Sequence, residues 1–382
     1  MSDETGPQPP GVPAAETSDP DIAAVLGEVI GEERTRAGEH GVTYGLLWRQ
    51  LERTVLGGKQ FRGRLVTAVH RGLGGSDRWG AAHLGAAFEV LHAGFLVHDD
   101  LIDRDTQRRG EPNLAASMRS AAQRAGASDP AAQHFAEASA VLAGDLAVAL
   151  AHRLLAQVEA PARNRAELSE LLWDTIYVSV AGELDDVAAS HGLWEVSHEK
   201  ALRIASEKTA FYSFQAPLRG AAVLAQAPSG TAGSLDRIGR HLGQAFQLAD
   251  DLVGLFAPEE TTGKSSLSDL REGKVTSLLL HARTREVWSR ISADIGRADM
   301  DEATARRIRA ELAASGAPEA VDTLARSALA RARAEVSEVL FGHDVVAVLL
   351  GACAMIEDSL DAAAGHVRAQ REGDGQAATA PR

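Results

Sequence analysis

Residues 91–105 read LHAGFLVHDDLIDRD, which joins an apolar helical run directly to a group of carboxylates. Asp99 and Asp103 are four residues apart, so on a helix they lie on one face, with Asp100 about a quarter-turn away. Because like charges at this spacing repel, such a helix either is solvated there or presents oxygen ligands to a hard cation such as Mg²⁺. This stretch alone leaves both interpretations open.

A helical pattern extends outward from this stretch over most of the chain. Apolar positions recur at three- and four-residue spacing, Ala is abundant, and no sustained alternation of Val, Ile and Thr occurs. We therefore predict an all-α fold with one large domain over residues 21–368, between disordered tails at residues 1–20 and 369–382. The expected helices are 21–37, 43–55, 61–73, 78–103, 131–157, 164–190, 197–208, 211–226, 232–256, 267–290, 301–314, 317–338 and 344–368.

The composition limits the classes of function. The 382 residues are 45% hydrophobic and can bury a large core. Asp and Glu total 53 against 39 Lys and Arg, and the net charge of −14 argues against a nucleic-acid binder. Cys353 is the only cysteine, which excludes an internal disulfide and fits a reducing compartment. No signal peptide is apparent, and the longest apolar run, 345–356, is too short to span a bilayer. We expect a cytoplasmic protein with no membrane span.

A second junction of the same kind lies at residues 246–254, FQLADDLVG. An apolar run again leads into an Asp pair, Asp250 and Asp251, and in both junctions a Phe stands four residues before the first Asp. Two helices that each end an apolar face with carboxylates could face each other across a bundle and hold divalent ions between them. A deep apolar slot would then lie beneath a site for metal and phosphate.

Cationic side chains stand beside the Gly turns and the Asp groups. Lys59 and Arg62 follow the turn at Gly57-Gly58 and open a helix whose N-terminal amides also favour an anion. Each cation alone could be a solvated surface charge, but together they predict pockets for phosphate oxygens, which guanidinium forks suit. The others follow an Asp group or close a helix: Arg108 and Arg109, Lys208 with Thr209, and Lys264 with Lys274.

Over residues 50–280 these motifs, in this order, resemble the trans-isoprenyl diphosphate synthases, or polyprenyl synthetases. The resemblance implies a helical bundle of the isoprenoid synthase type with a central apolar cavity. It also implies a homodimer that condenses isopentenyl diphosphate with an allylic diphosphate. The matching motifs are DDLID at 99–103, RRG at 108–110, LAGD at 142–145, KT at 208–209, GQAFQ at 243–247 before DD at 250–251, GK at 263–264 and DLREGK at 269–274.

The resemblance also implies roles for individual residues. Isopentenyl diphosphate would be held by Lys59, Arg62 and His92, with Arg109 helping. The allylic diphosphate would be held by Arg108, Lys208, Thr209, Gln247, Lys264 and Lys274. About three Mg²⁺ ions would be ligated by Asp99, Asp103 and Asp250, with Asp100 and Asp251 in support. The residues expected to carry the bond-breaking step are Asp99, Asp103, Asp250, Lys208 and Arg108.

The physical logic of the sequence agrees with that chemistry. An allylic diphosphate ionises to a carbocation and pyrophosphate, so the leaving group needs cations around it. Water must be kept from the carbocation, which explains an apolar slot beneath the carboxylates. The released pyrophosphate can take the final proton, so no separate protein base is required.

Four positions depart from the family pattern. Gln60 stands where a basic residue is usual, and Gly63 stands where Pro is common. Gly254 replaces the last Asp of the second motif, which leaves two carboxylates there. Glu183, in GELDD at 182–186, stands where Gln is frequent.

Product length depends on the helix that precedes Asp99. Phe95 lies one turn below Asp99, about 6 Å along the helix axis, and we predict that its ring restricts the apolar slot. Gly94 beside it would leave space, and Phe88 would line the slot further down. We therefore expect a short-chain product, farnesyl or geranylgeranyl diphosphate.

Other functions fit parts of the pattern. A His-Asp phosphohydrolase would use His98 and other helical His residues such as His70, His83 and His92 as metal ligands, but it leaves the second Asp pair unexplained. A class I terpene cyclase shares the helical slot and Mg²⁺ chemistry but needs no second diphosphate pocket. A non-catalytic helical subunit that binds a synthase partner is the third alternative, and the intact Asp and Lys motifs argue against it.

Overall fold

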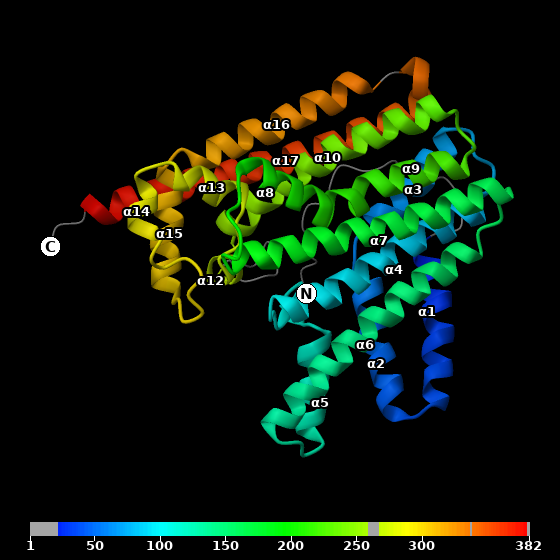
Figure 1. Ribbon diagram of the computed structural model, residues 1–382, viewed down its shortest axis with the longest axis horizontal. Helices are drawn as coiled ribbons and strands as arrows, with labels where there is room; N and C mark the ends of the chain where they lie inside the picture. Colours follow the sequence, from blue (N-terminus) through cyan, green and yellow to red (C-terminus); the bar gives the residue numbers. More distant parts are fainter. Residues whose placement is uncertain (1–21, 259–266, 337, 380–382) are drawn as a thin grey trace, which may run out of the picture.

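The computed structural model describes residues 22–258, 267–336 and 338–379. In these residues the regular structure is helical except for one short β-hairpin, so the all-α prediction is confirmed (Figure 1). In chain order the elements are α1 (Ile22–Glu39), α2 (Val42–Leu56), α3 (Phe61–Gly72), α4 (Arg78–Ile102), β1 (Gln107–Arg108), β2 (Glu111–Pro112), α5 (Leu114–Arg124), α6 (Asp129–Ala156), α7 (Ala162–Ser190), α8 (His198–Ala205), the π-helix η1 (Ser206–Gln215), α9 (Ala216–Leu224), α10 (Ser229–Phe256), α12 (Ser268–Glu272), α13 (Ser277–Arg283), α14 (Val287–Ile291), α15 (Glu302–Ala314), α16 (Ala317–Glu335) and α17 (Glu338–Thr379).

Helix α4 runs through the centre of the bundle and ends at the first aspartate motif. It begins at an N-cap, where the Asp77 carboxylate accepts a hydrogen bond from the Gly80 amide at 2.8 Å. It packs against α3 and α6, and side chains such as Val90 and Leu91 are fully buried. A helix that is apolar almost all round is one that other helices surround. The aspartates therefore lie at the point where an enclosed helix reaches the surface.

The segment 206–215 is a π-helix where the sequence predicted a break between two helices. Helices α8, η1 and α9 form one continuous run. Glycines let the neighbouring helices approach η1 closely, because a Cβ at Gly182 of α7 would collide with the Lys208 backbone and one at Gly243 of α10 with Ala210. Helices α7 and α10 therefore hold η1 between them. π-Helical turns are rare and occur often at functional sites.

The β-hairpin after α4 carries two of the predicted cations. Strand β1 pairs with β2 in antiparallel register, with Arg108 opposite Glu111. The two-residue turn has positive φ at both positions, 57° at Arg109 and 74° at Gly110, as a type I′ turn requires. A left-handed backbone is uncommon for a residue with a side chain, so the turn fixes Arg109 in an unusual position beside the first aspartate motif.

Three predictions about helix boundaries differ from the structure. Helix α5 was missed, although Asn113 caps it by accepting a hydrogen bond from the Ala116 amide at 2.9 Å. The single helix predicted at 267–290 is three short helices, because Gly273 ends α12 with a φ of 72° and Thr276 caps the start of α13. Helix α17 continues to Thr379, into the segment predicted to be a disordered tail. The predicted N-terminal tail lies outside the described residues.

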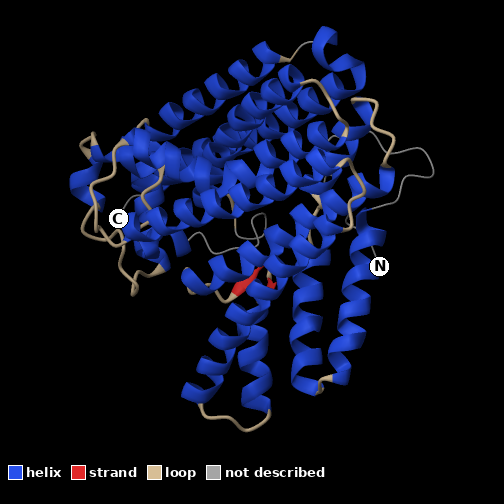
Figure 2. Cartoon of the chain, turned by 45° about the vertical axis from the view of Figure 1, so that its right-hand side comes forward, coloured by secondary structure: helices blue, strands red, loops and turns tan. Residues whose placement is uncertain are grey.

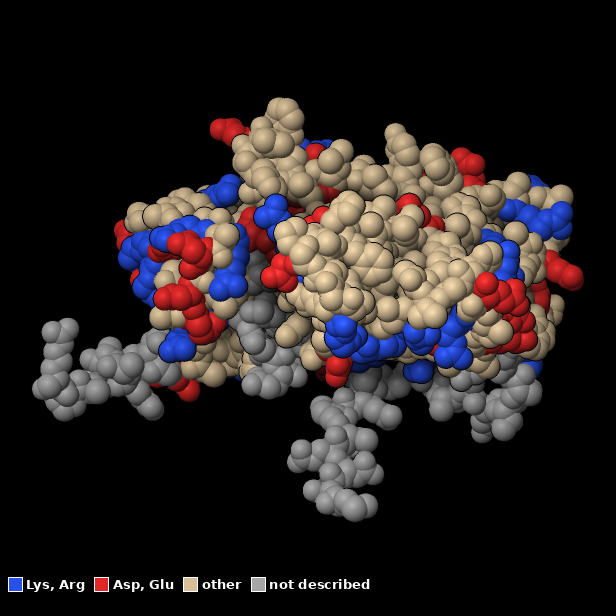
Figure 3. Space-filling view, turned by 90° about the horizontal axis from the view of Figure 1, so that it is seen from below, with Lys and Arg blue, Asp and Glu red and all other residues tan. Residues whose placement is uncertain are grey.

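Two helical hairpins, α1–α2 and α5–α6, extend from the main bundle on the same side, with the β-hairpin at their base (Figure 2). Seen from below, the molecule shows a broad area without charged side chains, bordered by Lys and Arg along one edge and by acidic groups (Figure 3). Uncharged surface of this extent can serve as a contact surface.

Three helices are long and apolar enough to cross a membrane by length and composition alone, α4, α6 and the part of α17 at 340–372. In the most apolar window of α4, 78% of the residues are buried inside the protein, which explains the apolar sequence by packing. The corresponding fractions are 50% for α6 and 44% for α17. The absence of a membrane span therefore stays a prediction.

Candidate active site

The first aspartate motif is held by Arg108 of the hairpin. Its Nε donates a hydrogen bond to Asp100 Oδ1 at 2.8 Å, and its Nη2 contacts Asp100 and lies 3.2 Å from Asp99 Oδ2. Asp100 is buried, so the guanidinium supplies the charge partner that a buried carboxylate requires. Burial opposes the charge of Arg108, but Asp100 and Asp99 outweigh it and raise its pKa.

Lys208 of η1 reaches the same motif from the other side. Its ammonium lies 3.2 Å from Asp99 Oδ1, 2.9 Å from Glu183 Oε2 and 2.8 Å from Asp186 Oδ2. Burial opposes its charge, but these carboxylates raise its pKa above the ordinary lysine value. Helices α4, α7 and η1 therefore converge on one ammonium.

Three carboxylates stand close enough to share a cation. One oxygen each from Asp99, Asp103 and Glu183 lies within 4.8 Å of the other two. Burial raises the pKa values of Asp103 and Glu183, and Asp99 contributes in the same direction. Burying like charges together is unfavourable unless a cation compensates them. The donor set is all oxygen, and Glu183 Oε1 is a buried acceptor that no described residue satisfies, so the residues present fit Mg²⁺.

Lys274 forms an ion pair with Asp103, the last residue of the first aspartate motif. Its ammonium donates to Asp103 Oδ2 at 2.8 Å and lies 3.3 Å from Glu272 and 3.5 Å from Asp269. Burial opposes its charge, but the carboxylates raise its pKa well above the usual value. The predicted DLREGK segment is thereby placed beside the first aspartate motif. Lys264, the other predicted cation of this loop, lies outside the described residues.

The second aspartate motif lies on α10. Asp250 is exposed and is not one of the carboxylates that approach one another within 4.8 Å. Gln247 donates a hydrogen bond to Asp251 Oδ1 at 2.9 Å, and burial raises the pKa of Asp251 to about 8. The nearby charges of Asp250, Asp269 and Asp186 raise this pKa further. The role of Asp250 as the opposing metal ligand therefore stays a prediction. Thr209, which was predicted to contact the allylic diphosphate, is half-buried in η1 beside Lys208.

A cluster of arginines surrounds His92. Arg62 donates a hydrogen bond to Ser213 Oγ at 2.7 Å, and its Cζ lies 4.8 Å from the centroid of the Tyr212 ring. The same ring stacks on His92 at 5.7 Å. Burial lowers the pKa of His92 well below its ordinary value, and Arg62, Arg109 and Arg108 lower it further. Three cations near a neutral imidazole create a positive potential that favours an anion.

Arg109 connects this arginine cluster with the Gly57-Gly58 turn. Its Nη1 lies 3.5 Å from the Thr54 carbonyl oxygen, and its guanidinium packs against both glycines. Burial and the nearby Arg108 lower its pKa. Lys59 follows the turn and is exposed, so its side chain can reach a ligand without losing a protein partner. The structure thus gathers most of the predicted isopentenyl diphosphate contacts on one side of α4.

The residues predicted to set product length have different surroundings. Phe95 meets the Tyr212 ring edge-on, with centroids 5.2 Å apart. Gly94 does not leave space: it faces α6, where an added Cβ would lie 3.0 Å from Ala147 Cβ. That part of the prediction is wrong, because Gly94 serves the close contact of two helices. Phe88 is 2% exposed and packs in the core against Gly220 of α9.

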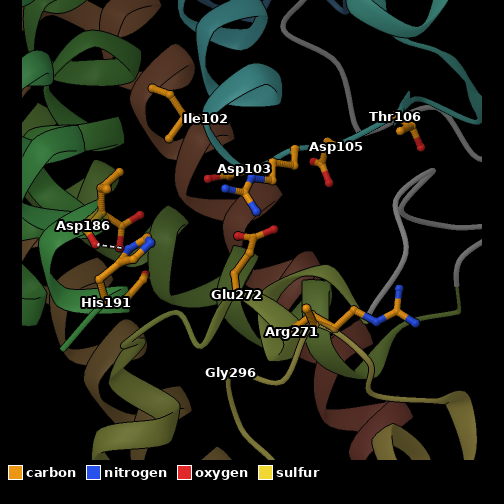
Figure 4. Close-up of a pocket in the computed structure, with 13 residues that line it drawn as sticks. Ile102, Asp103, Asp105, Thr106, Asp186, His191, Arg271, Glu272 and Gly296 are labelled. Atoms are coloured by element: carbon orange, nitrogen blue, oxygen red, sulfur yellow. Dashed lines mark hydrogen bonds between the residues drawn. The ribbon is translucent and has the colours of Figure 1, made fainter. Parts of the chain in front are cut away.

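A cavity of about 570 Å³ opens beside the carboxylates. It lies between the end of α4, the end of α7 and the loops around α12, with Asp103, Asp186 and Glu272 directed toward its interior (Figure 4). At its edge, His191 Nδ1 lies 2.9 Å from the Val187 carbonyl oxygen. Of the three carboxylates that approach one another, Asp103 lines this cavity, so this side of the group is open to a ligand.

Sequence reasoning missed several residues of this site. Asp186, Tyr212 and Ser213 were not predicted, and Glu183 was noted only as a departure from the family pattern. The acidic segment 182–186 was a visible signal for Asp186. Nothing in the sequence predicts the π-helical turn that points Tyr212 and Ser213 at Arg62. The histidines of the phosphohydrolase alternative are used elsewhere: His83 Nδ1 lies 2.9 Å from the Trp79 carbonyl oxygen and His98 Nε2 lies 3.4 Å from that of Val141.

Comparisons with known proteins agree with this geometry. The sequence pattern of the family described as polyprenyl synthetase matches residues 46–312. A geranylgeranyl diphosphate synthase of Sulfolobus acidocaldarius is 33% identical over 59% of this chain and 62% of its own length. A farnesyl diphosphate synthase of Mycobacterium tuberculosis is 34% identical over 57% of this chain and 55% of its own length. The chain thus spans somewhat more than half the length of these relatives.

Solved structures share the fold over nearly the whole described chain. The geranylgeranyl pyrophosphate synthase of Corynebacterium glutamicum, complexed with isoprenyl diphosphate and magnesium, has a TM-score of 0.79 at 25% identity and covers 87% of this chain and 97% of its own. A polyprenyl synthase of Caulobacter crescentus, complexed with calcium and isoprenyl diphosphate, has a TM-score of 0.68 at 27% identity and covers 89% of this chain and 98% of its own.

Proposed function

The chain belongs to the polyprenyl synthetase family, and from this premise we propose that it condenses isopentenyl diphosphate with an allylic diphosphate to give farnesyl or geranylgeranyl diphosphate. One observation carries the proposal: two separate sites for anions adjoin the end of α4. Lys208 and Lys274, together with Mg²⁺ when the carboxylates hold it, would form one, and the arginines around His92 would form the other. A reaction that condenses two substrates, each of which carries a diphosphate, needs a binding site for each diphosphate.

In the proposed reaction the bond between the allylic carbon and the diphosphate oxygen breaks, and its electron pair leaves with the diphosphate. Lys208, Lys274 and Arg108 stabilise the charge that develops on the leaving group. Mg²⁺, when bound at Asp99 and Asp103, adds Lewis-acid stabilisation of the same charge. The number of ions, about three by family resemblance, stays a prediction.

The second substrate is held by the arginine cluster. Arg62 and Arg109 bind its diphosphate, with Lys59 at the turn, so that its double bond faces the allylic cation. The π electrons of that double bond form the new carbon–carbon bond, and a proton then passes to the released diphosphate. Phe95 and Tyr212 stand beside this position and exclude water from the cation.

Assembly and location belong to the proposal as well. On α7, Trp173, Tyr177, Val180 and Leu184 are exposed and follow a helical spacing that puts them on one face. Val141 and Leu142 of α6 are also exposed. We propose that a second copy of the chain covers this α6–α7 stripe in a cytoplasmic homodimer.

The decisive experiment incubates the purified protein with Mg²⁺, isopentenyl diphosphate and one primer at a time: dimethylallyl, geranyl or farnesyl diphosphate. We expect chain elongation that stops at the farnesyl or geranylgeranyl product. Absence of product from folded protein with every primer contradicts the proposal, and longer products contradict the short-chain part. A cyclic hydrocarbon formed from geranylgeranyl diphosphate alone would favour the terpene cyclase alternative.

A further inference from the structure

Glu183 lies on α7, and its carboxylate faces the end of α4 that carries Asp99 and Asp103. It follows Gly182, where α7 approaches the Lys208 backbone so closely that no side chain fits between them. This approach directs the Glu183 carboxylate to Lys208, with Oε2 at 2.9 Å from the ammonium. Its other oxygen, Oε1, is buried, and no described residue donates a hydrogen bond to it.

An ion pair with Lys208 does not account for this carboxylate. The Lys208 ammonium already contacts Asp186 at 2.8 Å and Asp99 at 3.2 Å, so Glu183 shares it with two other carboxylates, of which Asp99 is also paired with Arg108. A buried acceptor without a donor is costly, and a residual negative charge in a partly buried site is more so. A neutral Gln at this position would remove one of the three negative charges.

The position of Glu183 also suits a cation. Oxygens that ligate one Mg²⁺ at about 2.1 Å can be at most about 4.2 Å apart. The Asp99, Asp103 and Glu183 oxygens already lie within 4.8 Å of one another, so small side-chain rotations bring all three into ligand range. Asp99 and Asp103 stand at the end of α4, and Glu183 stands on α7, whose position is set by its close approach to η1 at Gly182.

We propose that Glu183 is a further carboxylate of the metal site, shared with Asp99 and Asp103, and that it lets this chain bind a divalent cation before any diphosphate arrives. This inference rests on the proposed function, because it assigns Glu183 to the metal site of that reaction. It also gives a role to one of the four positions at which the chain departs from the family pattern. With Gln there, the diphosphate itself would have to bring the missing negative charge.

The test measures Mn²⁺ binding without substrate, by the electron paramagnetic resonance signal of unbound Mn²⁺ and by calorimetry. The wild type is expected to bind Mn²⁺ in the absence of diphosphate, and Glu183→Gln should weaken that binding about tenfold or more. Glu183→Asp, which keeps the charge, should recover part of the affinity. The control is Glu170→Gln, which changes an exposed carboxylate on the same helix and should leave the affinity unchanged. Circular dichroism melting shows that each variant is folded.

Equal Mn²⁺ affinity of the wild type and Glu183→Gln overturns the inference, as does a wild type that binds Mn²⁺ only with diphosphate. The condensation assay separates these results from a failure of the proposed function. Product formation together with unchanged Mn²⁺ affinity in Glu183→Gln contradicts this inference alone. Glu183-dependent Mn²⁺ binding without product contradicts the proposed function and supports the metal role of Glu183.

Discussion

The Lys208 ammonium lies 3.2 Å from the Asp99 carboxylate and joins the π-helix η1 to the end of α4. The contact places the cation that is proposed to stabilise the leaving diphosphate directly beside a proposed metal ligand. Both groups are partly buried, so their charges are weakly screened by solvent. The geometry of the site therefore depends on how closely α7 and α10 pack against η1.

Replacing Lys208 should impair catalysis more than substrate binding. Lys208→Gln removes a positive charge that is worth most when the diphosphate leaves, so kcat should fall by about 10²- to 10³-fold with a smaller change in KM. Steady-state kinetics with a fixed primer measures both. The matched control is Lys200→Gln, which removes the ion pair with Asp185 on the same side of the molecule and should leave kcat within about threefold. A loss confined to KM would contradict the assigned role.

Product length should respond to Phe95. Phe95→Ala removes the ring that meets Tyr212 at 5.2 Å and opens space one turn below Asp99, so the products should become longer than those of the wild type. Chromatography of the dephosphorylated products measures this. Phe88→Leu serves as the control, because Phe88 is enclosed in the core and its truncation should lower the melting temperature without lengthening the product. An unchanged product from folded Phe95→Ala would remove Phe95 from this role.

The sequence predicted the site well where the residues share one helix. The four-residue spacing of Asp99 and Asp103 places both on one face of α4, and the structure brings their oxygens within 4.8 Å. Glu183 joins them from another helix, through a close approach at Gly182 that no local pattern shows. Contacts of this kind depend on tertiary packing and cannot be derived from periodicity.

Gly94 shows a second limit of sequence reasoning. Successive residues on a helix point about 100° apart, so Gly94 and Phe95 face different neighbours. Residue spacing alone does not reveal how α4 is rotated within the bundle. In the structure Gly94 faces α6 and Phe95 faces η1. The same reasoning explains Tyr212, whose direction follows from the π-helical turn rather than from residue spacing.

The proposed dimer predicts a response to charge on α7. Tyr177→Glu introduces a carboxylate into the α6–α7 stripe, where burial against a second copy would be costly, so the variant should shift toward monomer. Size-exclusion chromatography with light scattering measures the mass. Val42→Glu is the control, since Val42 is 86% exposed at the start of α2 and lies outside the stripe. A wild-type monomer, or a Tyr177→Glu dimer of unchanged stability, would contradict the proposed interface.

Stability should fall on acidification, and His70 is one of the histidines, with His92, whose lowered pKa should contribute to this loss. The His70 side chain is buried against the turn at Gly75, and burial lowers its pKa from 6.5, more than Asp77 raises it. The unfolded chain therefore binds the proton more tightly, and the free energy of unfolding decreases as the pH drops below about 6.5. Each tenfold difference in proton affinity between the two states is worth about 1.4 kcal/mol. Melting at pH 7.5 and 5.5 should show a smaller loss for His70→Leu than for the wild type, whereas His134→Leu, at an exposed position, should match the wild type. An equal acid-induced loss in His70→Leu would show that other groups carry the dependence.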